Sequence, residues 1–278
     1  MIRHILTVSC GTLTSRVLGF LRDSLIAALL GAGAVADAFL VAFQFINVTR
    51  RSLNEGTLNA ALIPSYLRLR ESEGAVAAAA FAGRVLGSLS VILIGIALAL
   101  TALMPLVISL LAPGFAGRDA LQLAVDDARL MMPYFAFVGP VTVMMGVLNA
   151  EHRFVLTAFS PVLFNITLIA VLALLLMWRH EPQVCAYIIA GTVGIAGCLQ
   201  TLILIQRRPW RDGVARPIRV SFDPQIRAFF RKGIPGMFAN SGPQFLIVAG
   251  AIIASSSPSA VSWLYFANRL IELPLGMV

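Results

Sequence analysis

The sequence predicts an all-α, polytopic membrane protein. Of its 278 residues, 59% are hydrophobic and only 12% are charged, whereas a soluble domain carries roughly 25% charged residues. Apolar runs of about 20 residues or more, long enough to cross a bilayer as helices, recur along the chain. None of these runs shows sustained strand alternation, so each is predicted to satisfy its backbone hydrogen bonds as a helix.

About eight membrane-spanning helices are expected from these runs. The first six form an N-terminal lobe (1–206), a basic cytoplasmic linker covers 207–224, and two helices of a second lobe occupy 225–278. Because the last helical pattern is cut off without a polar tail, we expect the chain to be part of a longer protein. The spans are placed at 5–31, 37–67, 79–104, 123–149, 155–178, 184–206, 225–256 and 259–278.

The basic residues predict the orientation of these spans. The net charge of +8 does not indicate a nucleic-acid partner in a membrane protein, because Lys and Arg accumulate in cytoplasmic loops. One set of helix ends holds twelve basic residues, from Arg3 to Lys232, and the opposite set holds Arg118, Arg129 and Arg179. The N-terminus is therefore predicted to be cytoplasmic, and the turn at 31–36 faces outward.

Residues suited to metal binding or catalysis are not grouped in the sequence. The three cysteines and three histidines are far apart, so neither a metal site nor a disulfide framework is predicted. The chain has no nucleotide-binding glycine motif, and no Ser/His/Asp or Cys/His set is evident. The sequence therefore predicts a transporter rather than an enzyme, and no cofactor.

Charged residues lie within the first two spans, where they are costly. Arg16 is near the middle of 5–31, and Arg50 and Arg51 are near the middle of 37–67. An arginine at the bilayer centre costs about 2.5–3.5 kcal/mol on insertion scales, so it persists when it faces water, a partner or a ligand. Internal pairing is the alternative, Arg16 with Asp23 and Arg51 with Glu55. Full pairing would still leave positive charge in excess.

A polar stripe on the second span favours a cavity. Helical spacing puts four polar side chains on one face, and such a face lines either a water-filled cavity or a polar helix seam. A positive cavity suits an anion, and arginine favours phosphate or carboxylate, whereas an exporter of cationic drugs would need acids. The stripe consists of Gln44, Asn47, Arg51 and Asn54, and the last span adds Arg269 and Glu272.

Several motifs occurring in order resemble the MurJ/MviN family of lipid II flippases, part of the MOP exporter superfamily. The resemblance implies a two-lobed fold of fourteen helices in the bacterial cytoplasmic (inner) membrane. It also implies transport of lipid II, the undecaprenyl-pyrophosphate-linked peptidoglycan precursor, from the inner to the outer leaflet by alternating access. The motifs are SRVLGFLRD (15–23), DAFLVAF (37–43), RRSLNEG (50–56), APGF (112–115) and SWLYFANRLIELPLG (262–276).

The same resemblance suggests which residues form the site. Together with the polar stripe, it predicts a substrate-binding set and a gating or pairing set. One departure is Asn268, where relatives commonly have aspartate beside the last cavity arginine, which puts pairing there in doubt. The substrate-binding set is Ser15, Arg16, Arg22, Asn47, Arg50 and Arg269, and the gating or pairing set is Asp23, Asp37, Arg51, Glu55 and Glu272.

Other functions are compatible with part of these observations. A flippase for another polyprenyl-pyrophosphate-linked saccharide would need a similar positive cavity. A truncated, non-transporting membrane scaffold that recruits cell-wall synthesis proteins would not need the arginines. Lipid II and membrane lipids are the expected partners in the favoured function.

Overall fold

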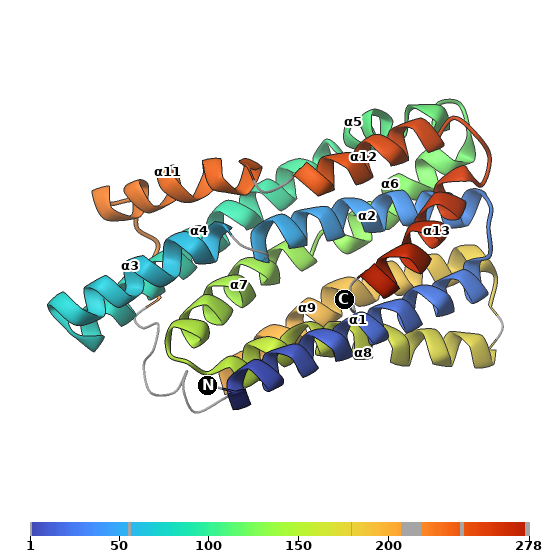
Figure 1. The fold of residues 1–278 in the computed structure, drawn as a ribbon. Helices are drawn as coiled ribbons and strands as arrows, with labels where there is room; N and C mark the ends of the chain where they lie inside the picture. The colour runs from blue at the N-terminus through green and yellow to red at the C-terminus, as the bar shows by residue number, and fades with distance from the viewer. Residues whose placement is uncertain (1, 55–56, 179, 207–217, 240–241, 276–278) are drawn as a thin grey trace.

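The computed structural model describes residues 2–54, 57–178, 180–206, 218–239 and 242–275. Within these ranges the chain is helical, apart from short connections, and contains no β-strand. The long helices run side by side in an elongated bundle (Figure 1). The all-α class predicted from the sequence is therefore confirmed.

The helices follow one another with short connections. Eight of the described elements differ from the predicted spans: six of them divide a predicted span into two helices, and two are short helices that were not predicted. In chain order the elements are α1 (Ile2–Leu30), α2 (Ala34–Asn54), α3 (Thr57–Glu73), α4 (Ala75–Ala102), α5 (Met104–Leu111), the 3₁₀ helix η1 (Pro113–Phe115), α6 (Asp119–Met131), α7 (Tyr134–Ala150), α8 (Phe154–Trp178), α9 (Pro182–Gln206), α11 (Pro224–Ala239), α12 (Gly242–Ala254) and α13 (Ala260–Leu275).

Fewer long apolar helices are found than the eight spans predicted. Among the described residues, α4, α8 and the 182–205 part of α9 are long and apolar enough to cross a membrane, and α6 with α7 adds a fourth if this bent pair is one span. The other segments are too short or too polar. In α2, for example, Asp37, Arg50 and Arg51 lie within 21 residues.

Three predicted spans are divided in the structure. The segment 37–67 forms α2 and α3, and 225–256 forms α11 and α12, with residues 55–56 and 240–241 outside the described part. The segment 123–149 bends by 45° between α6 and α7. This bend lies at Pro133, whose missing N–H and bulky ring interrupt a helix. The short helices α5 and η1 were not predicted, and each begins with a proline at its first or second residue.

Helix α2 lies at the centre of the bundle. It packs against α6 and α9 of the first lobe and against α12 and α13. The side chains from Ala38 to Phe43 are at most 2% exposed, and the rings of Phe39 and Phe43 stack with centroids 5.5 Å apart. Since protein surrounds this helix, its polar side chains lie inside the molecule and do not face lipid.

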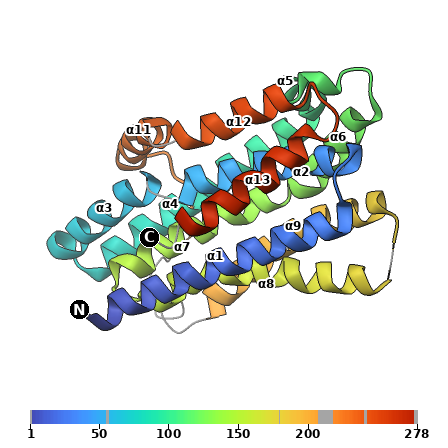
Figure 2. The ribbon, with the colours of Figure 1, turned by 45° about the vertical axis from the view of Figure 1, so that its right-hand side comes forward.

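The helices after residue 218 pack along the first lobe. Helix α11 lies against α3, while α13 lies beside both α1 and α2, as the two ribbon views show (Figure 2). The turn between α12 and α13 reaches η1 at one end of the bundle. The contact between α2 and α13, which includes the hydrogen bond between Asp37 and Ser262, joins parts of the chain more than 200 residues apart.

The end of the predicted linker is held against α4. The Ser88 hydroxyl donates to the Ser221 carbonyl at 2.7 Å and accepts from the Ser221 N–H at 3.0 Å. A Cβ on Gly87 would lie 2.5 Å from the Arg219 carbonyl oxygen, so this approach requires glycine. Arg84 pairs with Asp223 at 2.8 Å. Residues 218–223 are thus fixed to the first lobe, whereas the basic residues of 207–217 lie outside the described part.

Asp223 gives this anchor a predicted pH dependence. A hydrogen bond from the Ile226 N–H, with further help from Ser221 and the Arg84 charge, lowers the pKa of Asp223 below its usual value. Because the pKa of Asp223 is lower in the folded chain, the ionised carboxylate stabilises the fold fully above its ordinary pKa of about 4. This stabilisation is lost as the pH falls through the lowered pKa. Because Asp223 also caps α11, Asp223→Ala should reduce the free energy of unfolding by about 1 kcal/mol at pH 7.

The measurement is the thermal unfolding midpoint of wild type and of Asp223→Ala, in detergent, at pH 7 and at pH 3. Asp223→Asn keeps a capping oxygen without the charge and should lose less than the alanine variant. A difference between wild type and Asp223→Ala that stayed the same at both pH values would contradict the role of the ionised carboxylate.

Candidate functional site

A buried ion cluster joins α1 to α13. Both Arg22 and Asp23 are only 2% exposed. The Asp23 Oδ1 accepts from Arg22 Nε at 2.9 Å and Nη2 at 2.7 Å, and from the Tyr265 hydroxyl at 3.1 Å. The other oxygen, Oδ2, forms an ion pair with Arg269 Nε at 2.6 Å. One carboxylate therefore contacts two arginines from different parts of the chain.

The remaining contacts of Arg22 fix it in place. Its Nη1 donates to Asn165 Oδ1 of α8 at 2.8 Å, and its guanidinium carbon lies 5.0 Å from the centroid of the Phe43 ring. The Asn165 amide also donates to the Ser15 carbonyl at 3.1 Å, which ties α8 to α1. Arg22 is thus held by a carboxylate, an amide and an aromatic face, so its position is set before any ligand binds.

Arg50 lies on α2, close to Asn47 and to the Phe164 ring. Its Nη2 donates to Asn47 Oδ1 at 3.3 Å, and its guanidinium carbon lies 4.9 Å from the centroid of the Phe164 ring. The residue is half-buried. This arrangement keeps a second positive charge inside the bundle, on the helix that carries the polar stripe.

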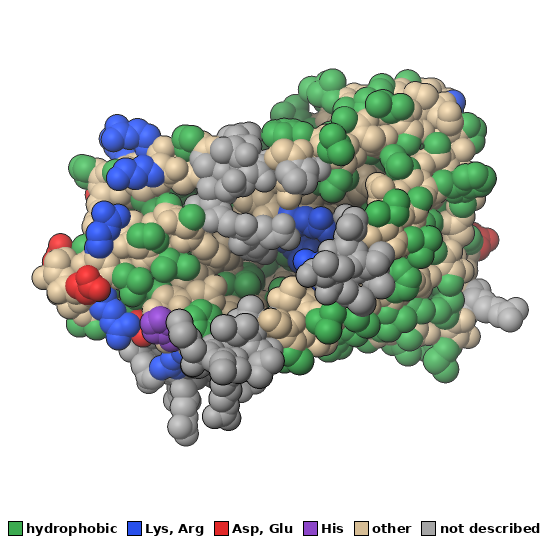
Figure 3. Space-filling model, in the orientation of Figure 1, with side chains coloured by type: hydrophobic (Ala, Val, Ile, Leu, Met, Phe, Trp, Pro, Cys, Tyr) green, Lys and Arg blue, Asp and Glu red, His purple; other side chains and the backbone are tan. Residues whose placement is uncertain are grey.

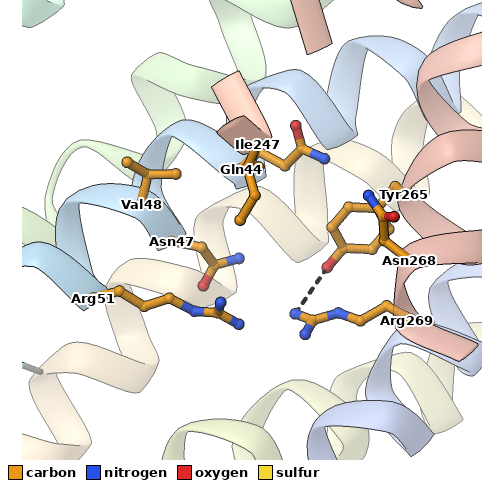
Figure 4. Close-up of a pocket in the computed structure, with 8 residues that line it drawn as sticks. All are labelled: Gln44, Asn47, Val48, Arg51, Ile247, Tyr265, Asn268 and Arg269. Carbon is orange, nitrogen blue, oxygen red and sulfur yellow. Dashed lines mark hydrogen bonds between the residues drawn. The ribbon is translucent and has the colours of Figure 1, made fainter. Parts of the chain in front are cut away.

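A pocket opens between α2, α12 and α13. Figure 4 shows the side chains of Arg51 and Arg269 reaching toward each other from α2 and α13, with Asn47 beside them. The Arg269 Nη2 also donates a long hydrogen bond to the Tyr265 hydroxyl oxygen at 3.5 Å. The pocket lining is Gln44, Asn47, Val48, Arg51, Ile247, Tyr265, Asn268 and Arg269.

Asp37 is buried but lies away from this pocket. Its Oδ1 accepts from the Ser262 N–H at 2.8 Å and from the Ser262 hydroxyl at 2.7 Å. Ser262 is in the first turn of α13, where unpaired N–H groups and the helix dipole favour a negative charge. Asp37 therefore caps α13 from α2.

The ion pairs in the structure differ from those predicted from the sequence. Asp23 pairs with Arg22 and Arg269, and Arg16, its expected partner, is exposed. An i, i+7 spacing did place Arg16 on the same face as Asp23, but the adjacent Arg22 folds back onto the carboxylate. Ser15 is half-buried. Glu55 and the Glu272 side chain lie outside the described part, so the Arg51–Glu55 pair is not described.

Several residues of the cluster were missed from the sequence. Asn165 is the clearest, since a buried amide in the strongly apolar α8 is itself a sign of a polar partner. Tyr265 could be singled out only by its place within the SWLYFANRLIELPLG motif. Phe43 and Phe164 resemble ordinary core residues, and their arginine contacts depend on the tertiary structure.

The molecular surface separates apolar and basic regions. Figure 3 shows hydrophobic side chains over much of the visible face, basic side chains gathered at the end holding α3 and α11, and further basic side chains in a hollow near the middle. The exposed basic residues of α3 and α11 are Arg68, Arg70, Arg227, Arg231 and Lys232.

Residues 26–278 match the family model described as "Lipid II flippase MurJ". The chain belongs to the MurJ family. A probable lipid II flippase MurJ of Rhizobium tropici is 33% identical over 281 residues, and that of Rhizobium meliloti (strain 1021) is 34% identical over 283 residues. Each alignment covers 100% of this chain and 52% of the relative, so the chain spans about half the length of these MurJ proteins.

Solved structures agree with the MurJ fold. A lipid II flippase MurJ in an inward closed conformation gives a TM-score of 0.79 at 23% identity, covering 98% of this chain and 55% of that one. An inward-facing multidrug resistance MATE transporter of the MOP superfamily gives 0.70 at 16% identity, covering 94% and 60%. These likenesses establish the fold class, a helical MOP-type arrangement, and at these identities they are evidence for the fold alone.

Proposed function

We propose that the chain forms the N-terminal half of a multi-pass flippase of the bacterial inner membrane, a transporter rather than an enzyme. Its substrate would be lipid II, moved from the inner to the outer leaflet. The support is twofold: relatives 33–34% identical are named probable lipid II flippases, and cationic side chains gather around a pocket between α2 and α13.

The excess of arginine in and around the pocket is the observation that carries this proposal. Arg22, Arg50, Arg51 and Arg269 outnumber the Asp23 carboxylate, even when Glu55 and Glu272 are added to it. A pyrophosphate brings two or more negative charges and several acceptor oxygens, which guanidinium groups bind as forks. A cationic drug would meet repulsion in the same place.

The position of the pocket suits alternating access. It is lined by α2 of the first lobe and by α12 and α13 of the second, so a movement of one lobe against the other would change which side of the membrane it faces. We place the basic α3–α11 end in the cytoplasm, together with the N-terminus, because Lys and Arg favour that side. The end with η1 and the α12–α13 turn would then face outward.

Lipid II binding by the chain in lipid nanodiscs tests the proposal. Arg269→Gln removes a pocket charge and should weaken binding by about tenfold to a hundredfold, in line with the loss of charged hydrogen bonds. Arg118→Gln, an exposed arginine before α6, is the matched control and should leave the affinity unchanged. Equal binding by all three chains would contradict a cationic substrate site.

Each of the two alternatives is tested by a separate experiment, one in the nanodisc binding assay and one in cells. Competition by another polyprenyl-pyrophosphate-linked saccharide at equal concentration should be weak if lipid II is the substrate. For the scaffold alternative, cells whose only copy carries Arg50→Ala would grow normally at normal protein levels. Growth arrest at normal levels would favour transport.

A further inference from the structure

The segment that precedes α11 presents large apolar side chains on its outer side. Residues 218–223 run along α4 without a helix or a turn. Every second residue is apolar, and the side chains of Ile218, Val220 and Phe222 are 52%, 54% and 46% exposed. A contiguous row of exposed apolar side chains marks a surface that contacts protein or membrane.

Two polar residues of the same segment are already bound within the protein. The Ser221 hydroxyl donates to the Asp223 carboxylate at 3.0 Å, and that carboxylate pairs with Arg84 of α4 at 2.8 Å. The backbone of Ser221 is held by the Ser88 hydroxyl, also of α4. These polar contacts fix the segment to α4, and the alternate apolar side chains remain on its exposed side.

The exposure pattern of α4 places this segment at the edge of the bilayer. Residues 81–90 of α4 are buried or half-buried, whereas every exposed residue from Val91 to Leu110, through α4 and α5, is apolar. As helix, this stretch is about 30 Å long, the thickness of the hydrocarbon core. Ser88, which holds the segment, lies within one helical turn of Val91. The apolar side chains are therefore level with the start of the lipid-facing surface.

We propose that residues 218–223 are an interfacial membrane segment, whose three apolar side chains insert among the lipid acyl chains just below the headgroups. The leaflet is the cytoplasmic one in the orientation proposed above. The segment continues the lipid-facing surface of α4, and exposed basic side chains beside it suit the headgroup layer. The end of the linker is thus held by α4 on one side and by lipid on the other. The basic residues are Arg219, Arg227 and Arg231.

Tryptophan fluorescence in liposomes of brominated phospholipids tests this location, because bromine quenches a nearby indole ring. The parent chain has its three native tryptophans replaced by phenylalanine. In it, Phe222→Trp should lose most fluorescence with lipids brominated near the headgroup end of the acyl chain. Leu98→Trp, on the lipid-facing part of α4, should lose most with deeper bromines. Val76→Trp, 84% exposed and about 22 Å before Val91, should lose fluorescence only to acrylamide in the water.

Val220→Trp repeats the measurement at a second position, and the unfolding midpoint of each variant should equal that of the parent chain. Quenching of both segment variants by acrylamide and not by bromine would place residues 218–223 in water and overturn the proposal. Protection from both quenchers would also overturn it, because the segment would then be covered by protein, such as a second copy of the chain. Since the liposomes contain no lipid II, neither result bears on the proposed transport function.

Discussion

Replacing Asp23 with alanine is expected to lower the free energy of unfolding by about 3–5 kcal/mol, the cost of breaking a buried ion pair from one side. Asp23 is the carboxylate that contacts both Arg22 and Arg269. Its removal leaves Arg22, which is 2% exposed, without its closest negative charge. The α1–α13 contact should loosen at the same time, because the Tyr265 hydroxyl also loses its acceptor.

The unfolding midpoint in detergent measures this loss, with Arg16→Ala as the matched control. Arg16 is an exposed arginine on the same helix, and its removal should change the midpoint little. Asp23→Asn retains an acceptor oxygen and should fall between wild type and Asp23→Ala. A midpoint for Asp23→Ala close to that of Arg16→Ala would show that Arg22 is compensated by other groups.

The sequence predicted the continuous helices better than the interrupted ones. Helices α8 and α9 lie within a few residues of their predicted spans because their apolar runs are unbroken. The division of 37–67 was missed because α2 contains no proline or glycine up to Asn54, and the signal that the sequence does contain, Gly56 between α2 and α3, was not used. Pro133 was visible in the sequence, but a proline can either kink a helix or end it.

Only the part of the site that lies on one helix could be predicted from the sequence. The spacing of Gln44, Asn47 and Arg51 is local to one helix, so their shared face could be inferred, and all three line the pocket. The partners of Arg22 come from α1, α8 and α2, and no spacing rule connects Asn165 with it. Pairing in a membrane protein is decided by which helices meet, and a single sequence contains little information on that choice.

Gly114 of the APGF motif is expected to tolerate no side chain. A Cβ there would lie 2.2 Å from the Ser255 carbonyl oxygen and 2.5 Å from the Ser256 Cα, atoms of a backbone that cannot rotate away. The Gly114 N–H also donates to the Ser255 hydroxyl at 3.1 Å. Gly114→Ala should push η1 from the α12–α13 turn and lower the free energy of unfolding by about 1–3 kcal/mol, as overpacking does.

Two comparisons separate this contact from a general effect of alanine. Gly95→Ala introduces the same methyl group on an exposed position of α4 with no atom within 4 Å, and it should keep or slightly raise the unfolding midpoint, since alanine favours helix. Ser255→Ala removes the hydrogen bond without a clash and should cost less than Gly114→Ala. Hydrogen exchange over residues 255–260 should rise most in Gly114→Ala, because separation of η1 exposes that turn. If exchange there stayed at the wild-type level while the midpoint fell, the damage would lie elsewhere, and η1 would not hold the second lobe in place.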